Sequence, residues 1–355
     1  MNKQILMISV IIISIFGLIM ITSSSYVWAE YKFDDPYKYF KNQFLFLVLG
    51  IVLMIIVSKI NYRIYYEKAN LLLLIGTILL ILVLIPGIGM IRNGSRSWFG
   101  IGSFGIQPSE AAKLIMIIFT AKYLSNNREK TSIIPILGVS TLIFGLIMLQ
   151  PDFGTGVVLM MIVIGMIFIS GANLSLFVKM GIIGLIGIVI LIIMAPYRLE
   201  RILSFLNPWQ DPLGSGFQII QSLYAIGPGG LFGFGFGNSR QKHFYLPEPQ
   251  TDFIFSIISE EFGFLGCLVI VGLFLLIIIA GFRIARNCHD LFGKYLAFGI
   301  TFWIAFQAVL NLMVVIGLIP VTGVTLPFLS YGGSSLLILM VSVGIVLNVS
   351  MYQQK

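Results

Sequence analysis

The sequence predicts an all-α, polytopic membrane protein with ten transmembrane helices. Its 355 residues are 58% apolar and only 10% charged, and the mean hydropathy is +1.01. A soluble protein of this size carries about 25% charged residues, because its surface faces water, and a disordered chain has low hydrophobicity. The composition therefore excludes both classes, and the expected solvent is lipid.

Long uncharged runs predict the individual helices, since about 20 apolar residues cross a bilayer. The runs without Asp, Glu, Lys or Arg are residues 4–29, 42–58, 69–91, 131–151, 153–178, 180–197 and 262–282. A further span at about 109–125 is apolar around Glu110 and Lys113, and residues 295–355 are long enough for two spans that separate at Pro320 and Pro327. We expect the whole chain, 1–355, to form a single membrane domain.

The Lys and Arg residues predict the orientation, because short cytoplasmic loops are enriched in them. With the N-terminus inside, the inner side holds Lys3, Lys59, Arg63, Lys68, Lys122, Arg128, Lys130, Lys179, Arg283, Arg286, Lys294 and Lys355. The short outer loops hold only Lys32, Lys38, Lys41, Arg92 and Arg96. Both termini are therefore expected in the cytoplasm, and the net charge of +8 is mostly this signal. A nucleic-acid partner is not expected, because that would need a clustered basic patch.

Four segments interrupt the apolar pattern, and in the predicted topology all of them face outward. Charges and irregular backbone are costly in a membrane unless they line a cavity or contact protein. The segments are residues 92–114, 150–156, about 195–252, and 326–335. We expect functional groups among them.

The first segment leads into a helix that starts at Pro108 and Ser109, two residue types favoured at helix starts. Glu110 and Lys113 are three residues apart, so they share a helical face and can pair. Two interpretations stay open: an ion pair that fixes the start of the helix, or a pair that lines a polar cavity. In QPDFGTG, Asp152 is either a turn-forming residue or a chemical group.

The third segment, about 195–252, is a large predicted extracytoplasmic loop between the seventh and eighth helices. It carries four cations, Arg198, Arg201, Arg240 and Lys242, and many glycines, which disfavour a spanning helix. Phe217–Ile226 could form one short interfacial helix. Loops of this length in compact proteins are usually functional.

The long loop ends at Thr251 and Asp252, where the eighth helix is expected to begin. These residues could serve only as a helix cap and as a partner of the helix dipole. Alternatively, Asp252 contacts substrate, since it closes a basic, glycine-rich loop at the membrane boundary. Glu260 and Glu261 lie two turns deeper and need protein or cavity partners. In the fourth segment, LPFLSYGGSS, the small residues favour close helix packing.

Together these segments predict an outward cavity that holds both carboxylates and cations. Cations can bind a pyrophosphate and stabilise it as a leaving group, and a carboxylate can take a proton from an attacking hydroxyl. This suits a lipid-anchored substrate with a phosphate-bearing head and hydroxyl groups. A transporter of an anionic solute would give much the same pattern, so the residues alone leave both classes open.

Six motifs resemble, in order and along essentially the whole chain, those of the shape, elongation, division and sporulation (SEDS) family. They are QPSE (107–110), QPDFGTG, NPWQDPLGSGFQIIQS, GPGGLFGFG, LPEPQTDFIFSIISEE and LPFLSYGGSS. The short N-terminal segment and YKFDD (31–35) are most similar to the FtsW and SpoVE branch of RodA, FtsW and SpoVE proteins.

The resemblance implies an inverting peptidoglycan glycosyltransferase of the bacterial cytoplasmic membrane, serving cell division or spore cortex synthesis. Such enzymes polymerise lipid II at the outer face into β-1,4-linked glycan and release undecaprenyl pyrophosphate. The family's catalytic aspartate falls on Asp252, and its cavity glutamate and lysine fall on Glu110 and Lys113. Arg96, Arg198, Arg201, Arg240 and Lys242 are expected to bind substrate.

The resemblance also implies the partners: lipid II, the nascent glycan strand, membrane lipids and a class B penicillin-binding protein that crosslinks the strand. No cofactor and no metal-ligand cluster is evident, although pyrophosphate chemistry often uses a divalent cation. The alternative functions are a lipid II flippase and a non-catalytic scaffold for the transpeptidase.

Overall fold

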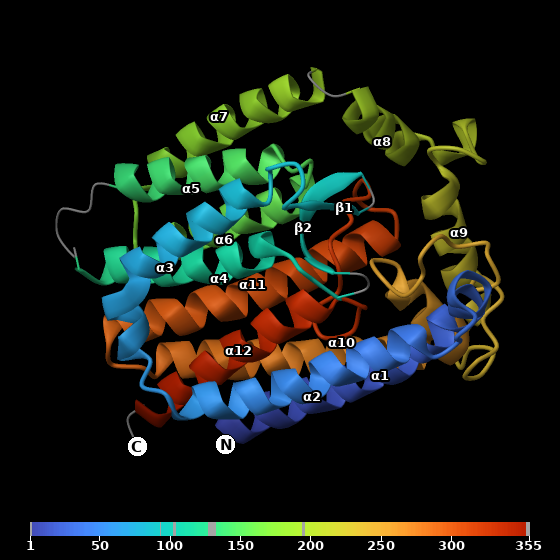
Figure 1. The fold of residues 1–355 in the computed structure, drawn as a ribbon, viewed down its shortest axis with the longest axis horizontal. Coiled ribbons are helices and arrows are strands. Elements are labelled where there is room, and N and C mark those ends of the chain that lie inside the picture. Colours follow the sequence, from blue (N-terminus) through green and yellow to red (C-terminus); the bar gives the residue numbers. More distant parts are fainter. Residues whose placement is uncertain (1, 93, 102–103, 127–132, 194–195, 353–355) are drawn as a thin grey trace.

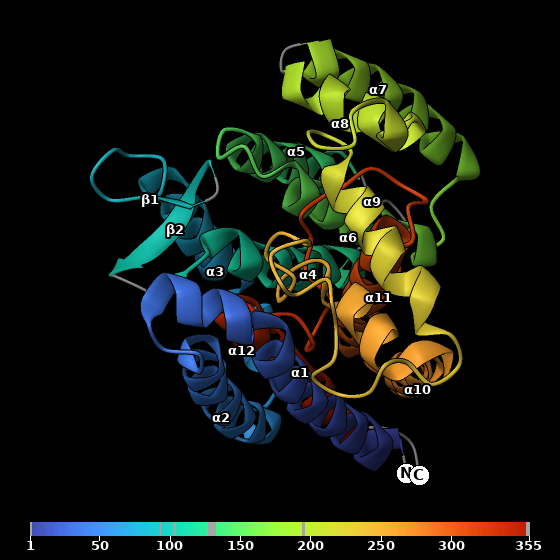
Figure 2. The ribbon, with the colours of Figure 1, turned by 90° about the vertical axis from the view of Figure 1, so that its right-hand side faces the viewer.

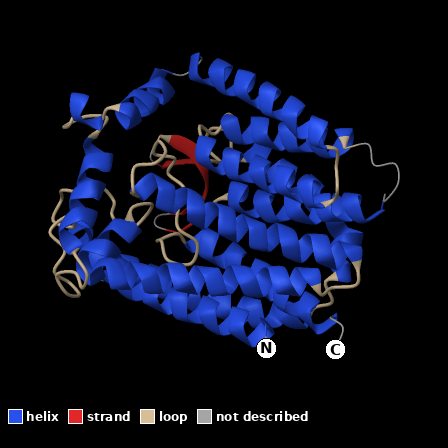
Figure 3. Cartoon of the chain, turned by 180° about the vertical axis from the view of Figure 1, so that it is seen from behind, coloured by secondary structure: helices blue, strands red, loops and turns tan. Residues whose placement is uncertain are grey.

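The computed structural model describes residues 2–92, 94–101, 104–126, 133–193 and 196–352, and most of them are helical. Most of the long helices lie side by side in one bundle (Figures 1 and 3). They are α1 (Asn2–Phe33), α2 (Lys38–Lys59), α3 (Arg63–Leu82), α4 (Pro108–Asn126), α5 (Ile134–Met148), α6 (Phe153–Ile169), α10 (Ile254–Arg286), α11 (Leu291–Val315) and α12 (Gly333–Val349). The helix α7 (Leu174–Ile193) stands apart from this bundle (Figures 1 and 2).

Six helices of the described residues are long and apolar enough to cross a membrane: α1, α2, α3, α10, α11 and the segment Gly333–Tyr352. The helices α4, α5, α6 and α7 also lie at the other four predicted ranges, but α5 and α6 are only 15 and 17 residues long. The chain is thus a multi-pass membrane protein by composition, while the count of ten spans stays a prediction. The start of α1 and the end of α12 lie at the same end of the bundle, as an even number of spans requires (Figures 1 and 2).

The centre of the bundle is built around α11 and α12, which are the most buried of the six apolar helices. Small residues let the neighbouring helices approach closely, as is usual between membrane helices. A Cβ on Gly299 of α11 would meet Met166 and Ile117, and one on Gly333 of α12 would meet the ring of Phe46. The packing role predicted for the small residues of LPFLSYGGSS is therefore supported.

A small sheet departs from the all-α prediction. It is antiparallel in the order β1 (Met90–Arg92), β2 (Ser95–Ile101) and β3 (Phe104–Ile106), with Met90 opposite Trp98 and Gly100 opposite Gly105. The sequence between β1 and β2 is Asn-Gly, the strongest short hairpin signal, and aromatic residues suit a half-buried strand. The first of the four irregular segments therefore contains a hairpin strand and a third strand that leads into α4.

The predicted long loop is partly helical and lies at one end of the bundle, which we call the loop end (Figures 1 and 2). It contains α8 (Pro196–Leu206), the 3₁₀ turns η1 (Pro208–Gln210) and η2 (Gly227–Gly229), and α9 (Phe217–Ile226). The short helix predicted at Phe217–Ile226 is confirmed with the same bounds. The following stretch, residues 230–253, has no regular secondary structure and runs to the start of α10.

Two helix boundaries differ from prediction, because a run without charges does not show where a helix stops. The predicted sixth span, 153–178, ends as α6 at Ile169, and Gly171 follows with a φ of +86°, a conformation that glycine adopts readily. The next helix, α7, already begins at Leu174 and contains Lys179. Lys179 therefore lies within a helix and not in the inner loop where the charge count placed it.

Candidate functional site

Glu110 and Lys113 form a buried ion pair in the first two turns of α4. The Lys113 ammonium lies 2.7 Å from Glu110 Oε1, and the two residues are 1% and 6% exposed, for Lys113 and Glu110 respectively. Lys113 also donates to Gln307 Oε1 at 3.1 Å and lies 4.8 Å from the centroid of the Trp303 ring. The predicted pairing is confirmed, and the Lys113 ammonium faces protein groups of α11.

The polar face of α11 joins this pair to the segment before α10. Trp303, Gln307 and Asn311 are spaced four residues apart, so they form one stripe along the helix. The Gln307 amide donates to Thr325 O at 2.9 Å, and the Asn311 amide donates to Val324 O at 2.8 Å and to Asp252 O at 2.7 Å. A single helix face therefore contacts the Lys113 ammonium at one turn and the Asp252 backbone at the next.

Asp252 is partly exposed and precedes α10, which begins at Ile254. Its Oδ1 accepts from the Thr251 hydroxyl at 3.0 Å, and that hydroxyl also donates to Glu248 O at 2.7 Å. The N-cap residue of α10 is Phe253, and no side chain caps the helix. The interpretation of Thr251 as the cap of this helix is therefore wrong.

Asp152 acts as a helix cap and as a bridge between motifs. Its Oδ1 accepts from Thr155 N at 3.2 Å at the start of α6, and its Oδ2 accepts from Gln107 Nε2 at 2.9 Å. The Gln107 backbone N donates to Ser334 Oγ at 3.2 Å, and Ser334 Oγ donates to Gly105 O at 2.8 Å. Asp152 is thus a helix cap rather than a turn-forming residue, a chemical role for it stays a prediction, and three motifs meet just before α4.

The helix α10 is broken at Gly263, where the glycine-rich stretch of the long loop, residues 227–237, contacts it. Gly263 has φ +64° and ψ −161°, outside the helical region. Loop amides replace the lost helix donors: Phe234 N donates to Glu260 O at 2.9 Å and Gly235 N to Glu261 O at 3.0 Å. Beyond the break, Phe264 N donates to Gly230 O at 2.8 Å. The freed backbone groups are thus satisfied by the loop, as a membrane-level helix break requires.

A second cluster of buried charged residues anchors the long loop to α10, just before the break at Gly263. Glu260 and Glu261 are 1% and 0% exposed. Glu260 accepts from the Ser239 hydroxyl and from Arg240 N at 2.9 Å. Glu261 Oε1 accepts from Lys242 Nζ at 3.3 Å and from Ser23 Oγ of α1 at 2.6 Å. These are the partners that the sequence required for the two glutamates, and Lys242, 7% exposed, faces them and not a cavity.

Of the remaining predicted cations, Arg96 and Arg240 have described side chains, and neither is among the partners named above for the Glu110–Lys113 pair. Arg96 lies in β2 opposite Ile91 and is partly buried. Arg240 is exposed, lies 5.2 Å from the Phe234 ring centroid, and borders an open hollow of about 410 Å³ with His243 and Tyr245. Arg198 and Arg201 belong to α8, but their side chains lie outside the described residues.

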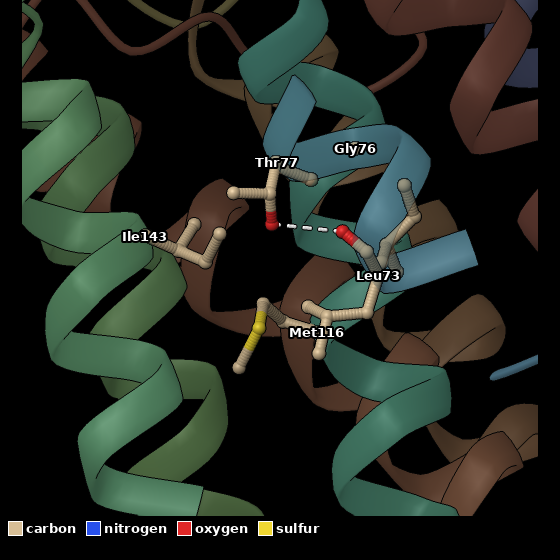
Figure 4. Close-up of a pocket in the computed structure, with 7 residues that line it drawn as sticks. Leu73, Gly76, Thr77, Met116 and Ile143 are labelled. Carbon is tan, nitrogen blue, oxygen red and sulfur yellow. Dashed lines mark hydrogen bonds between the residues drawn. The ribbon is translucent and has the colours of Figure 1, made fainter. Parts of the chain in front are cut away.

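Neither a second gap in the bundle nor a cluster of metal-binding side chains adds a reactive site among the residues that the structure describes. The gap between α3, α4 and α5 is lined by apolar groups, and its one hydroxyl, on Thr77, already donates to Leu73 O at 2.8 Å (Figure 4). Among the residues that the structure describes, no group of three His, Cys, Asp or Glu side chains could hold a metal ion. The use of a divalent cation stays a prediction.

Comparison with known proteins decides the family. The profile of the FtsW/RodA/SpoVE family, described as cell cycle protein, matches residues 3–355. The chain belongs to this family. Stage V sporulation protein E of Bacillus subtilis is 54% identical over 98% of this chain and 97% of its own length. A probable peptidoglycan glycosyltransferase FtsW of Trichlorobacter lovleyi is 42% identical over 98% of this chain and 92% of its own length.

Two solved structures have the same fold. A chain of a peptidoglycan synthase complex, described as coordinating polymerization and crosslinking, matches with a TM-score of 0.76 at 33% identity, over 95% of this chain and 96% of that one. The rod shape determining protein RodA of Thermus thermophilus matches with a TM-score of 0.72 at 29% identity, over 99% and 97%. The family resemblance predicted from the six motifs is confirmed.

Gln307, Asn311 and Trp303 are the residues of this FtsW/RodA/SpoVE site that sequence reasoning missed. They lie in a run that contains no charged side chain, and a search for charges inside apolar runs passes over neutral amides. Their four-residue spacing is the signal that would have found them, because it places two amides and an indole N–H on one helical face. Buried amides need partners, so such a stripe indicates a polar contact between helices.

Replacing Lys242 by Met is expected to destabilise this family member by about 3–5 kcal/mol, because Glu261 would stay buried without its cation. Thermal unfolding of the purified protein measures the effect. The matched control is Lys41→Met, which breaks the exposed Lys41–Asp35 pair and should lower the melting temperature far less, because water screens exposed charges. Equal melting temperatures for the two variants would contradict the role given to the buried pair.

Proposed function

We propose that this FtsW/RodA/SpoVE family member is an inverting peptidoglycan glycosyltransferase that polymerises lipid II into β-1,4-linked glycan. Relatives of nearly full length are named as probable peptidoglycan glycosyltransferases, and a chain with the same fold belongs to a peptidoglycan synthase complex. The observation that carries the proposal is the polar stripe of α11, which links the Glu110–Lys113 pair to the Asp252 segment at the loop end. Cell division or spore cortex synthesis is the proposed process, and the name of the Bacillus subtilis relative, stage V sporulation protein E, supports a role in sporulation.

In the proposed reaction Asp252 is the general base. Its carboxylate takes the proton of the 4-hydroxyl on the acceptor's N-acetylglucosamine, and that oxygen attacks the anomeric carbon of the lipid-linked donor. The new glycosidic bond forms as the bond to the undecaprenyl pyrophosphate oxygen breaks, which inverts the configuration. One carboxylate suffices, because the departing pyrophosphate needs little protonation.

Cations are proposed to stabilise the charge that the departing pyrophosphate develops. Lys113 is the buried candidate, since its ammonium is held by Glu110 and Gln307 on the stripe that leads to Asp252. Arg240, exposed beside the open hollow, and Arg96, Arg198 and Arg201 are candidates for binding the head group at the loop end. Lys242 is a weaker candidate, because its buried pairing with Glu261 already occupies it.

The proposed site faces outward, with both termini of this multi-pass protein in the cytoplasm. The charge distribution favours this orientation, and the loop end lies opposite the end where α1 starts. A class B penicillin-binding protein is the proposed partner, supported by the structural match to a chain of a synthase complex.

A polymerisation assay in detergent micelles tests the function. The purified full-length protein with its penicillin-binding partner is expected to convert lipid II into glycan polymer, which gel electrophoresis resolves. Transbilayer movement has no meaning in micelles, so polymer there supports the enzyme over a flippase or a scaffold. Lack of polymer from a folded complex, with or without added Mg²⁺ or Mn²⁺, would overturn the proposal; dependence on either ion would assign the cation.

A further inference from the structure

We propose that Asn311 and Gln307 are positioning residues, which hold the Asp252 segment and the Glu110–Lys113 pair in a fixed relation across one turn of α11. This inference rests on the proposed function and assigns the two amides no contact with substrate. Both side chains are almost fully buried, at 0% and 1% exposed.

Asn311 secures the Asp252 segment through donors alone. Its amide nitrogen donates to Asp252 O at 2.7 Å and to Val324 O at 2.8 Å, which uses both of its hydrogens. Its Oδ1 is buried without a hydrogen-bond partner, so the two donated bonds are what the side chain contributes. The bond from Asn311 therefore ties the Asp252 carbonyl to α11.

Gln307 orients the cation one turn away. Its Oε1 accepts from Lys113 Nζ at 3.1 Å and from Trp303 Nε1 at 2.7 Å, while its Nε2 donates to Thr325 O at 2.9 Å. The indole and the ammonium are both donors and the carbonyl is an acceptor, so the amide has only one orientation that satisfies all three. The Lys113 ammonium is thereby held among Glu110, Gln307 and the Trp303 ring.

The two amides also bond to the same segment, residues 316–332 between α11 and α12, which we call the strap. Val324 and Thr325 are consecutive residues of the irregular segment between α11 and α12, and their carbonyls accept from Asn311 and Gln307 respectively. Any shift of this strap along α11 would therefore disturb both amides together. Since displacements of about 1 Å can cost about 10²-fold in rate, this frame matters most for the reaction step and least for binding.

The test is Asn311→Leu, which keeps the approximate shape and removes both donors. We expect kcat for polymerisation to fall about tenfold to 10²-fold, while KM for lipid II and the pH profile of the residual activity stay close to those of the wild type. Asn311→Gln, which keeps the donating amide, should recover part of the loss.

Asn348→Leu is the matched control. Asn348 of α12 is equally a buried amide that clamps backbone, donating to Ser58 O at 2.8 Å and accepting from Tyr62 N at 2.9 Å, but between α2 and α3. It should lower the melting temperature by as much as Asn311→Leu does and leave kcat of the folded protein unchanged.

Equal kcat values for wild type and Asn311→Leu, or equal losses in the Asn311 and Asn348 variants, would overturn the positioning role. If Asn311→Leu does not accumulate as folded protein, Gln307→Met decides, with the same expected fall in kcat and the same overturning result. A wild-type protein that makes no polymer would instead refute the proposed function, so the two failures are distinguishable.

Discussion

Asp252→Asn is expected to abolish polymer formation while the fold and the binding of lipid II are kept. The asparagine has the same shape and can still accept from the Thr251 hydroxyl, which lies 3.0 Å from Oδ1. It cannot accept the proton of an attacking hydroxyl, and general-base catalysis contributes typically about 10²–10⁴-fold. Glycan synthesis by the purified complex measures the loss, and the melting temperature and lipid II affinity measure what is kept.

Asp35→Asn is the control for this experiment, because Asp35 is another carboxylate of a predicted outer loop. It is partly exposed, and a hydrogen bond from Lys41 holds the pKa of its carboxyl below the ordinary value, so Asp35 is ionised at neutral pH. Its replacement should leave polymerisation unchanged. Normal glycan chains from Asp252→Asn, in a preparation where Asp35→Asn is also normal, would remove Asp252 from the mechanism.

The local elements could be predicted from the sequence because their causes are local. A Pro-Ser pair starts α4 at Pro108, the bounds of α9 follow from one apolar stretch between glycine-rich segments, and Pro320 and Pro327 lie in the break before α12. The Glu110–Lys113 pair also follows from spacing alone, because residues three apart share a helical face.

The partners that join distant segments could not be predicted. The position of Glu260 and Glu261 in an apolar run predicts that they need partners. It does not identify those partners, because Lys242 of the loop and Ser23 of α1 come close to Glu261 only in the folded protein. For the same reason Lys242 was assigned to substrate binding, since an outward loop cation and a buried anchor are indistinguishable in sequence. The strap contacts of Gln307 and Asn311 are equally non-local.

For the glycine-rich stretch, the absence of a spanning helix could be predicted from the sequence, but the reason for its glycines could not. Its composition correctly predicts that residues 227–237 do not form a spanning helix. The physical reason is a close backbone approach: a Cβ on Gly229 would meet Ser259 O, and one on Gly233 would meet the Glu261 backbone. Glycine is required there because the loop backbone bonds directly to the broken turn of α10.

Gly263→Ala is expected to destabilise the protein strongly. It should prevent the backbone bonds between residues 230–235 of the loop and residues 260–265 of α10, which we call the junction, from forming. At φ +64° and ψ −161° the backbone is in a region essentially restricted to glycine, and an alanine there costs about 1–3 kcal/mol in conformation alone. The added Cβ would also lie 2.6 Å from Leu231 C and from Phe232 N, backbone atoms that cannot move without breaking the loop's bonds to Phe264 and Leu265. The yield of folded protein and its melting temperature, measured by size exclusion after heating, report the effect.

Gly272→Ala provides the matched comparison within the same helix, nine residues further on. A Cβ on Gly272 would meet no atom within 4 Å, so alanine fits there and should preserve or slightly raise stability, by about 0.5–1 kcal/mol. The contrast isolates the junction from any general intolerance of α10 to larger residues. Asp252 lies just before α10, and the junction fixes the first part of that helix. Gly263→Ala protein that does fold should therefore also lose polymerisation. If Gly263→Ala melts and polymerises like Gly272→Ala, the importance of the junction is refuted.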